Sequence, residues 1–180
     1  MPSTHQFTVS VFIGISLDGF IARPDGGIDW LTSRAEGAGD YGYDAFTADI
    51  DTVVMGRATY EVVTGFGPQM WPYDGKDVHV LSTQLDAHAD DRITVHRDFD
   101  ELVAGLDLRG AKRIYADGGQ LIQTFLQAGL VSDITITRAP VLIGSGLPLF
   151  GPLNADIDLT HRSTRVLGAG FTQSTYSVAR

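Results

Sequence analysis

The chain has 180 residues, of which 43% are hydrophobic and 19% are charged, and this length and composition predict one globular domain over residues 1–180. Its formal net charge of −9 argues against nucleic acid or an anionic membrane as the main partner. The sequence has no cysteine, which excludes disulfides and thiolate sites and favours a cytoplasmic location. No apolar run approaches the roughly 18 residues that a membrane span needs.

Hydrophobic periodicity and turn residues predict the elements in chain order. The first half reads as strands over 7–17 and 20–22, a loop around 28–42, a helix over 43–50, a strand over 52–55 and a helix over 58–63. A Gly/Pro loop over 65–76 precedes strands over 78–81 and 93–96, a helix over 99–106, a strand over 113–116, a helix over 119–128 and a strand over 132–137. The tail, residues 158–180, predicts an antiparallel hairpin.

Alternating strands and helices predict an α/β fold, in which a mostly parallel central sheet has helices on both faces and an antiparallel C-terminal hairpin at its edge. Ligands of such sheets bind at the carboxyl ends of the strands. The residues that follow each strand are therefore the ones to inspect for function.

Two of these strand ends carry a glycine that leads directly into a helix. Gly56 follows the strand that ends at Met55, and Gly118 with Gly119 follows the strand that ends near Ala116. A glycine at this position lets an anion approach the free backbone N–H groups of the helix. The neighbouring Arg57 suits a phosphate. The alternative reading is a tight turn beside a solvated arginine, and neither standard glycine-rich nucleotide motif is present.

Several sequence blocks occur in an order that resembles the dihydrofolate reductase superfamily. They are S-L-D-G-F-I-A (16–22), V-V-M-G-R-A-T-Y-E (53–61), L-S-T (81–83), D-G-G-Q-L-I (117–122) and I-T-R-A-P with G-S-G-L-P-L-F (136–150). Together they are most similar to the reductase branch of riboflavin biosynthesis, the RibD C-terminal domain, from about residue 7 to the end of the chain. The resemblance implies a dihydrofolate reductase-like three-layer sandwich, NADPH as cofactor and a homodimer.

The resemblance also assigns cofactor-binding residues, and all of them lie at predicted strand ends. It implies main-chain contacts to the nicotinamide from Gly14, Ile15, Ile21 and Ala22, phosphate contacts from Gly56, Arg57, Ala58 and Thr59, adenosine contacts from Leu81, Ser82 and Thr83, and pyrophosphate contacts from Asp117, Gly118, Gly119, Gln120 and Leu121. Within this set, Arg57 matches the arginine that favours the 2′-phosphate of NADPH. Asp117 replaces a glycine of true dihydrofolate reductases and matches an acidic position of the riboflavin branch.

The substrate side offers four candidate catalytic residues, namely Asp18, Asp40, Asp44 and Thr137. We expect hydride transfer from NADPH to a C=N or C=O group of a small pterin-like or aminopyrimidine compound. Two alternatives are a true dihydrofolate reductase, which Asp29 disfavours by replacing a family proline, and an NADP(H)-binding module without catalysis. The histidines stand in no metal-binding spacing, so we expect no metal site.

Overall fold

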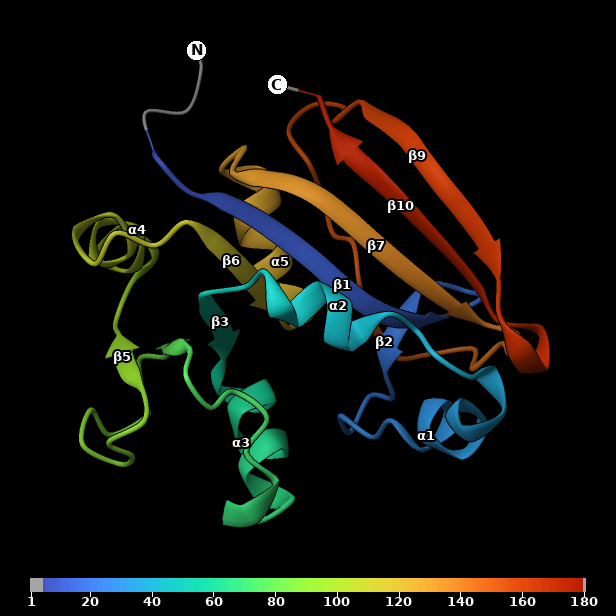
Figure 1. The fold of residues 1–180 in the computed structure, drawn as a ribbon, viewed down its shortest axis with the longest axis horizontal. Helices are drawn as coiled ribbons and strands as arrows, with labels where there is room; N and C mark the ends of the chain where they lie inside the picture. Colours follow the sequence, from blue (N-terminus) through green and yellow to red (C-terminus); the bar gives the residue numbers. More distant parts are fainter. Residues whose placement is uncertain (1–4, 180) are drawn as a thin grey trace.

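The computed structural model describes residues 5–179, and a central eight-stranded sheet dominates it (Figure 1). The strand order is β5-β4-β3-β6-β1-β7-β10-β9. The strands are β1 (Thr8–Ser16), β3 (Thr52–Gly56), β4 (Asp77–Leu81), β5 (Thr94–His96), β6 (Arg113–Asp117), β7 (Val131–Ala139), β9 (Leu159–Val166) and β10 (Thr172–Val178). Neighbours from β5 to β7 pair in parallel, whereas β10 and β9 pair antiparallel. A separate antiparallel pair joins β2 (Phe20–Ala22) to β8 (Leu147–Pro148).

Helices cover both faces of the sheet, which gives three layers. They are α1 (Asp29–Ala35), α2 (Tyr43–Ala48), α3 (Arg57–Gly65), α4 (Phe99–Leu108) and α5 (Gly119–Gln127). One apolar cluster packs α4 and α5 against one face of the sheet, with Leu102 and Phe125 fully buried. A second cluster packs α2 and α3 against the other face, and Figure 1 shows α2 in front of the sheet with α5 behind it. The predicted α/β three-layer architecture is confirmed.

The structure corrects the predicted loop around residues 28–42. Asp29–Ala35 forms helix α1, and Trp30 is its one buried residue, packed with Ala139 and Phe171. Such a short segment contains too few turns to show helical periodicity. The C-terminal hairpin is confirmed as β9 and β10, although its predicted last residue, Arg180, lies outside the described residues.

The strand register brings distant residues to one face near the carboxyl ends. The pairing of β1 with β6 runs from Thr8 to Ser10, which lies opposite Tyr115, whereas β1 stays paired with β7 as far as Ser16. Since side chains alternate between faces, Phe12 and Gly14 of β1 share the face of Tyr115. The same alternation adds Asp117 on β6 and Thr137 on β7, which pairs with Gly14.

This shared face is the one that α1 and α2 cover. The Phe12 ring stacks on Phe46 of α2 with centroids 4.8 Å apart, and Tyr115 meets Phe46 edge-on at 5.2 Å. A Cβ on Gly14 would lie 3.0 Å from Leu31 of α1. We call it the α1/α2 face below.

Candidate functional site

The two glycine junctions predicted from sequence lie in contact with each other. A Cβ placed on Gly118 would be 2.8 Å from Oγ1 of Thr59 and 3.9 Å from the backbone N of Gly56. Gly118 also has φ +103°, a conformation that side-chain-bearing residues rarely adopt. The strand order explains this contact, because β3 and β6 are parallel neighbours with Met55 opposite Asp117. The N-termini of α3 and α5 therefore form one site.

Neither helix N-terminus at this site is capped by a side chain. Gly56 precedes α3 and Gly118 precedes α5, and neither helix has a side-chain hydrogen bond at its cap. By contrast, Asp98 caps α4 by accepting a hydrogen bond from the Glu101 N–H at 2.8 Å. Within residues 5–179, no atom would come within 4 Å of a Cβ on Gly56. The uncapped N–H groups and the open space at Gly56 fit an anionic group such as a phosphate.

The remaining predicted phosphate and adenosine residues lie around these junctions. Arg57 is the first residue of α3, and its exposed guanidinium lies 3.6 Å from the Glu61 carboxylate. Ser82 is buried just beyond β4, where its hydroxyl oxygen accepts hydrogen bonds from the N–H groups of Gln84 and Leu85 at 3.2 and 3.0 Å. Its side chain is therefore used in the turn. The exposed residues of the predicted set are Ala58, Thr83 and Gln120, and Leu81 is half-buried.

The predicted nicotinamide residues pack beside the second junction. A Cβ on Gly119 would lie 2.7 Å from Cδ1 of Ile21, so this glycine makes room for β2. Ala22 is also buried, at the end of β2. The side chains of Ile15 and Leu121 belong to the core against α4 and α5, which leaves only their main chains for a cofactor.

Asp117 differs from the other candidate carboxylates because it is half-buried, whereas Asp18, Asp40 and Asp44 are exposed. Burial raises the pKa of its carboxyl to about 6, although the Tyr115 hydroxyl and the Gly118 N–H partly oppose this rise by stabilising the carboxylate. It follows that a measurable fraction of Asp117 is protonated near neutral pH. Sequence reasoning placed Asp117 at the pyrophosphate and gave it no acid–base role.

Three tyrosines from distant parts of the chain surround Asp117. Tyr115 donates a hydrogen bond to the Phe12 carbonyl at 3.2 Å, and its ring meets Tyr43 of α2 with centroids 6.4 Å apart. Tyr73 is buried in the same cluster and hydrogen-bonds to Tyr43. Burial, with Asp117 as the next contribution, raises the pKa of Tyr43 to about 12 and also raises the pKa values of Tyr73 and Tyr115. The phenols thus stay protonated. Residues 43, 73 and 115 are far apart in the chain and form no local motif, so no sequence signal could have predicted this cluster.

The structure gives Asp18 a clear structural task. Its carboxylate accepts hydrogen bonds from Ser16 Oγ at 2.6 Å and from the backbone N–H groups of Ile143 and Gly144 at 3.2 and 2.8 Å. The bond from Ser16 is the main cause that lowers the pKa of Asp18. An exposed, ionised carboxylate with these partners anchors the loop before β8 to the loop after β1.

The other two candidate carboxylates lie at the start of α2. Asp40 accepts the Gly42 N–H at 2.7 Å, and Asp44 is exposed in the first turn of the helix. Both are more open to water than Asp117, which is half-buried. Their catalytic roles, like that of Asp18, stay predictions.

Thr137 is buried on the α1/α2 face within a chain of hydrogen bonds that crosses the sheet. The Gln173 side-chain amide of β10 donates to Thr137 Oγ1 at 2.8 Å and to the Tyr41 carbonyl at 2.9 Å. Its amide oxygen accepts from Arg165 Nε at 2.8 Å. Gln173 therefore ties the loop before α2 to the sheet and holds Thr137 as an acceptor.

Replacing Gln173 by methionine is expected to lower the free energy of unfolding by about 1–3 kcal/mol, because the part-buried Tyr41 carbonyl and the buried Thr137 hydroxyl lose their donor. The matched control is Ser177→Ala on the same strand, which removes only a surface bond to Arg162 and should cost less than about 0.5 kcal/mol. Chemical denaturation measures both. Equal stability of the wild type and the Gln173 variant would contradict this role.

Two buried histidines form a pair away from the glycine junctions. His79 of β4 and His96 of β5 share a hydrogen bond of 2.8 Å between Nδ1 and Nε2, and their rings stack at 5.0 Å. Burial is the main cause that lowers both pKa values, while Asp77 acts against this for His79 and Glu101 for His96. Both rings are therefore neutral at pH 7.

The histidine pair is expected to make the fold acid-sensitive. Below the unfolded-state pKa of about 6.5, the unfolded chain takes up protons that the buried pair does not bind, so stability falls by up to about 1.4 kcal/mol per pH unit for each ring. Asp117 acts in the opposite sense, because its pKa is raised by folding. Comparison of His79→Gln with the wild type between pH 7 and pH 5 isolates the pair, and His88→Gln on an exposed loop is the control. Parallel stability curves for wild type and His79→Gln would refute this account.

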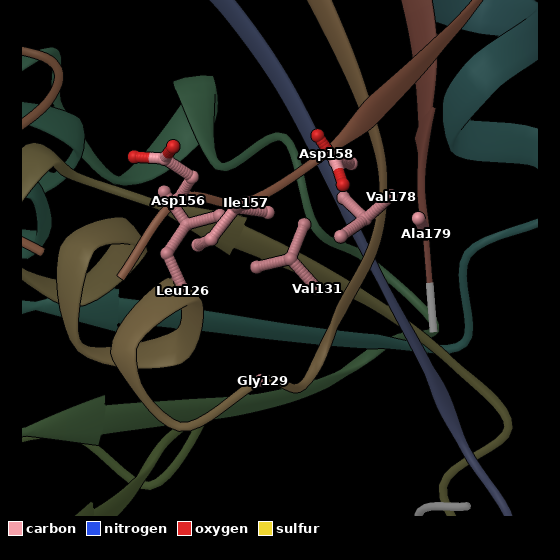
Figure 2. A pocket seen from close by; sticks show the side chains of 8 residues that line it. All are labelled: Leu126, Gly129, Val131, Asp156, Ile157, Asp158, Val178 and Ala179. Atoms are coloured by element: carbon pink, nitrogen blue, oxygen red, sulfur yellow. The ribbon is translucent and has the colours of Figure 1, made fainter. Parts of the chain in front are cut away.

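A cavity of about 340 Å³ lies at the other end of the sheet, at the start of β7 (Figure 2). It is lined by Leu126, Gly129, Val131, Asp156, Ile157, Asp158, Val178 and Ala179. None of the predicted site residues lines it. Among residues 5–179, no three metal-ligating side chains come together, and no helix has the length and apolar character to cross a membrane.

Known proteins share this architecture. The structure is similar to dihydrofolate reductase from Enterococcus faecalis, solved with NADP(H), with a TM-score of 0.69 and 17% identity over 98% of this chain and 99% of that one. The fold is therefore dihydrofolate reductase-like. A crystal structure from Shewanella sp. PV-4 matches with a TM-score of 0.86 and 36% identity, over 97% of this chain and all of the other.

Sequence comparison identifies the family. Residues 7–172 match the model of the RibD C-terminal domain, and the chain belongs to this family. It is also 36% identical to the uncharacterized protein YwjB of Bacillus subtilis over 160 residues. This alignment covers 88% of this chain and 91% of YwjB. The predicted resemblance is thus confirmed, and with it a reductase-like fold.

Proposed function

We propose that this protein is an NADPH-dependent reductase that transfers a hydride to a C=N or C=O group of a small pterin-like or aminopyrimidine compound. The observation that carries the proposal is the contact between the two uncapped helix N-termini, at Gly56 and Gly118. Two adjacent sets of free N–H groups suit a pyrophosphate, and membership of the RibD C-terminal family supports the choice of cofactor.

The residues of the site would divide the work of binding. The N–H groups that follow Gly56 and Gly118 would hold the phosphates, and Arg57 would bind the 2′-phosphate with a charge-assisted contact. Ile21 and the Gly14 main chain would line the nicotinamide end. When bound, the cofactor supplies the hydride, while the protein orients the acceptor and excludes water.

The α1/α2 face would receive the acceptor. Gly14 has no side chain and lies beneath Leu31 of α1, Asp117 lies on the neighbouring β6, and Thr137 pairs with Gly14 from β7. Asp117 would hold or give a proton at its carboxyl oxygen, since its raised pKa keeps part of it protonated. A neutral carboxyl and a hydroxyl suit the nitrogen and oxygen atoms of a heterocycle.

The direct test is to offer the protein NADPH with acceptors of different classes and to measure NADPH oxidation as a loss of NADPH absorbance. We expect turnover with an aminopyrimidine or pterin-like imine or carbonyl compound, and none with dihydrofolate. Turnover of dihydrofolate would instead support a true dihydrofolate reductase. Tight NADPH binding without oxidation in any class would support a binding module that lacks catalysis.

Two further expectations accompany the proposal. We propose a homodimer in the cytoplasm, on the basis of the family resemblance and the absence of cysteine. Sedimentation of the purified chain at micromolar concentration checks the assembly, and a monomer throughout would overturn it.

A further inference from the structure

Asp117 occupies an unusual position for a carboxylate, because it immediately precedes the helix N-terminus that we propose as a phosphate site. Its carboxyl is stabilised in the charged form by the Gly118 N–H, the same group that an incoming phosphate would contact. A Cβ on Gly118 would lie 2.8 Å from Thr59 Oγ1, so Gly118 also borders the N-terminus of α3. A phosphate bound here would compete with the Asp117 carboxylate for donors and repel its charge.

Among residues 5–179, the groups that shift the pKa of Asp117 include no basic side chain to offset that repulsion. The phenols whose pKa values Asp117 raises are those of Tyr43 on α2, Tyr73 before β4 and Tyr115 on β6, while β3 presents Met55 opposite. The covering helices carry Asp44 on α2, which is exposed, and Arg57 on α3, which lies beside Glu61. The phenols remain protonated, so the proton balance of this cluster rests on Asp117.

We propose that binding of NADP(H) drives protonation of the half-buried Asp117 carboxyl, so that occupation of the cofactor site and uptake of a proton by this acid are coupled. The proposal rests on the proposed cofactor site at Gly56 and Gly118. Loss of the Gly118 N–H contact and the approach of negative charge both favour the neutral carboxyl. We therefore expect the protein to take up protons when NADP(H) binds at this junction.

The protonated acid has a use in the proposed reduction. The acceptor carbon gains a hydride with its electron pair, and the acceptor nitrogen or oxygen gains a proton. The O–H bond of Asp117 breaks as the new N–H or O–H bond forms, which leaves a carboxylate on the protein. The reduced acceptor is then neutral, and Asp117 regains its proton from water.

The test is calorimetric titration with NADP⁺ at pH 7 in buffers of different ionisation enthalpy, which counts protons exchanged on binding without any turnover. A carboxyl with a pKa of about 6 is about one-tenth protonated at pH 7. A rise of about one pKa unit or more, which a single charge about 6 Å away can produce, gives an uptake of about 0.4 proton or more. In the same experiment, Asp117→Asn should take up fewer protons by that amount.

The 2′-phosphate of the ligand also titrates near pH 6, so the difference between the wild type and Asp117→Asn is the quantity that counts. Asp91→Asn, an exposed carboxylate on a loop, is the matched control and should behave like the wild type. The ¹³C carboxyl shift of Asp117, followed against pH with and without NADP⁺, gives a second measurement that needs no variant.

The outcomes separate the two levels of the argument. Equal proton uptake by wild type and Asp117→Asn, with an unchanged carboxyl titration, would overturn the inference while NADP⁺ binding stands. No binding of NADP⁺ to the wild type would overturn the proposed function and this inference with it. A higher pKa of Asp117 in the complex, matched by uptake that the Asn variant lacks, supports both.

Discussion

Arg57→Ala is expected to lower the affinity for NADPH by about tenfold to a hundredfold while leaving the affinity for NADH unchanged. A hydrogen bond to a charged group contributes about 1.5–3 kcal/mol, and only NADPH carries the 2′-phosphate that Arg57 would contact. Arg57 is exposed, and its ion pair with Glu61 at 3.6 Å adds little to stability. Its loss should therefore be specific to binding.

The experiment compares the dissociation constants of the two cofactors by fluorescence titration. Arg109→Ala removes the same charge from an exposed arginine near Asp77, at the amino end of β4, and should leave both affinities unchanged. If the wild type binds NADH as tightly as NADPH, Arg57 does not read the 2′-phosphate. A parallel loss of both affinities in Arg57→Ala would also reject that role.

Gly118→Ala is expected to abolish most cofactor binding and to destabilise the fold. Alanine at φ +103° costs about 1–3 kcal/mol in backbone strain, and its Cβ would lie 2.8 Å from Thr59 Oγ1. The methyl group would also occupy the space between the two helix N-termini. We expect NADPH affinity to fall by at least about tenfold, in addition to the loss of stability.

Gly110→Ala separates strain from binding, because Gly110 has φ +72° after α4 with open space around its Cβ. It should lose about 1–2 kcal/mol of stability and keep full NADPH affinity. Denaturation and calorimetry on both variants give the comparison. If Gly118→Ala binds NADPH as tightly as the control does, the junction is not the phosphate site.

Local sequence signals were sufficient for most of the fold. The strand that ends at Gly56 and the helix that follows it are visible as a β-branched run and a glycine, and the structure places them there. Helix α1 was not predicted, because a short helix beside a glycine-rich stretch is too brief to show helical periodicity. Its formation depends on burying Trp30 against Ala139 and Phe171, contacts that come from far along the chain.

The two glycine junctions of the candidate site were predictable from the sequence, whereas the environment of Asp117 was not. Gly56 and Gly118 can be recognised in the sequence, because glycine favours the close approach of a group to the backbone. The raised pKa of Asp117 depends instead on removal of its carboxyl from water, in a region where tertiary packing brings Tyr43 and Tyr73 together. Burial of this kind decides a pKa and leaves no trace in local spacing. The hydrogen bonds of Asp18 to Ile143 and Gly144 likewise depend on tertiary structure, while its catalytic role stays a prediction.

The central claim is that the N-termini of α3 and α5 together hold the phosphates of NADPH. The most direct measurement is an NMR titration of ¹⁵N-labelled protein with NADP⁺, following the backbone amides of residues 56–59 and 118–121. We expect the largest shifts at these two segments, with little change at the cavity near Val131 in Figure 2. Shifts that leave both segments unchanged, or that cluster around that cavity, would contradict the account.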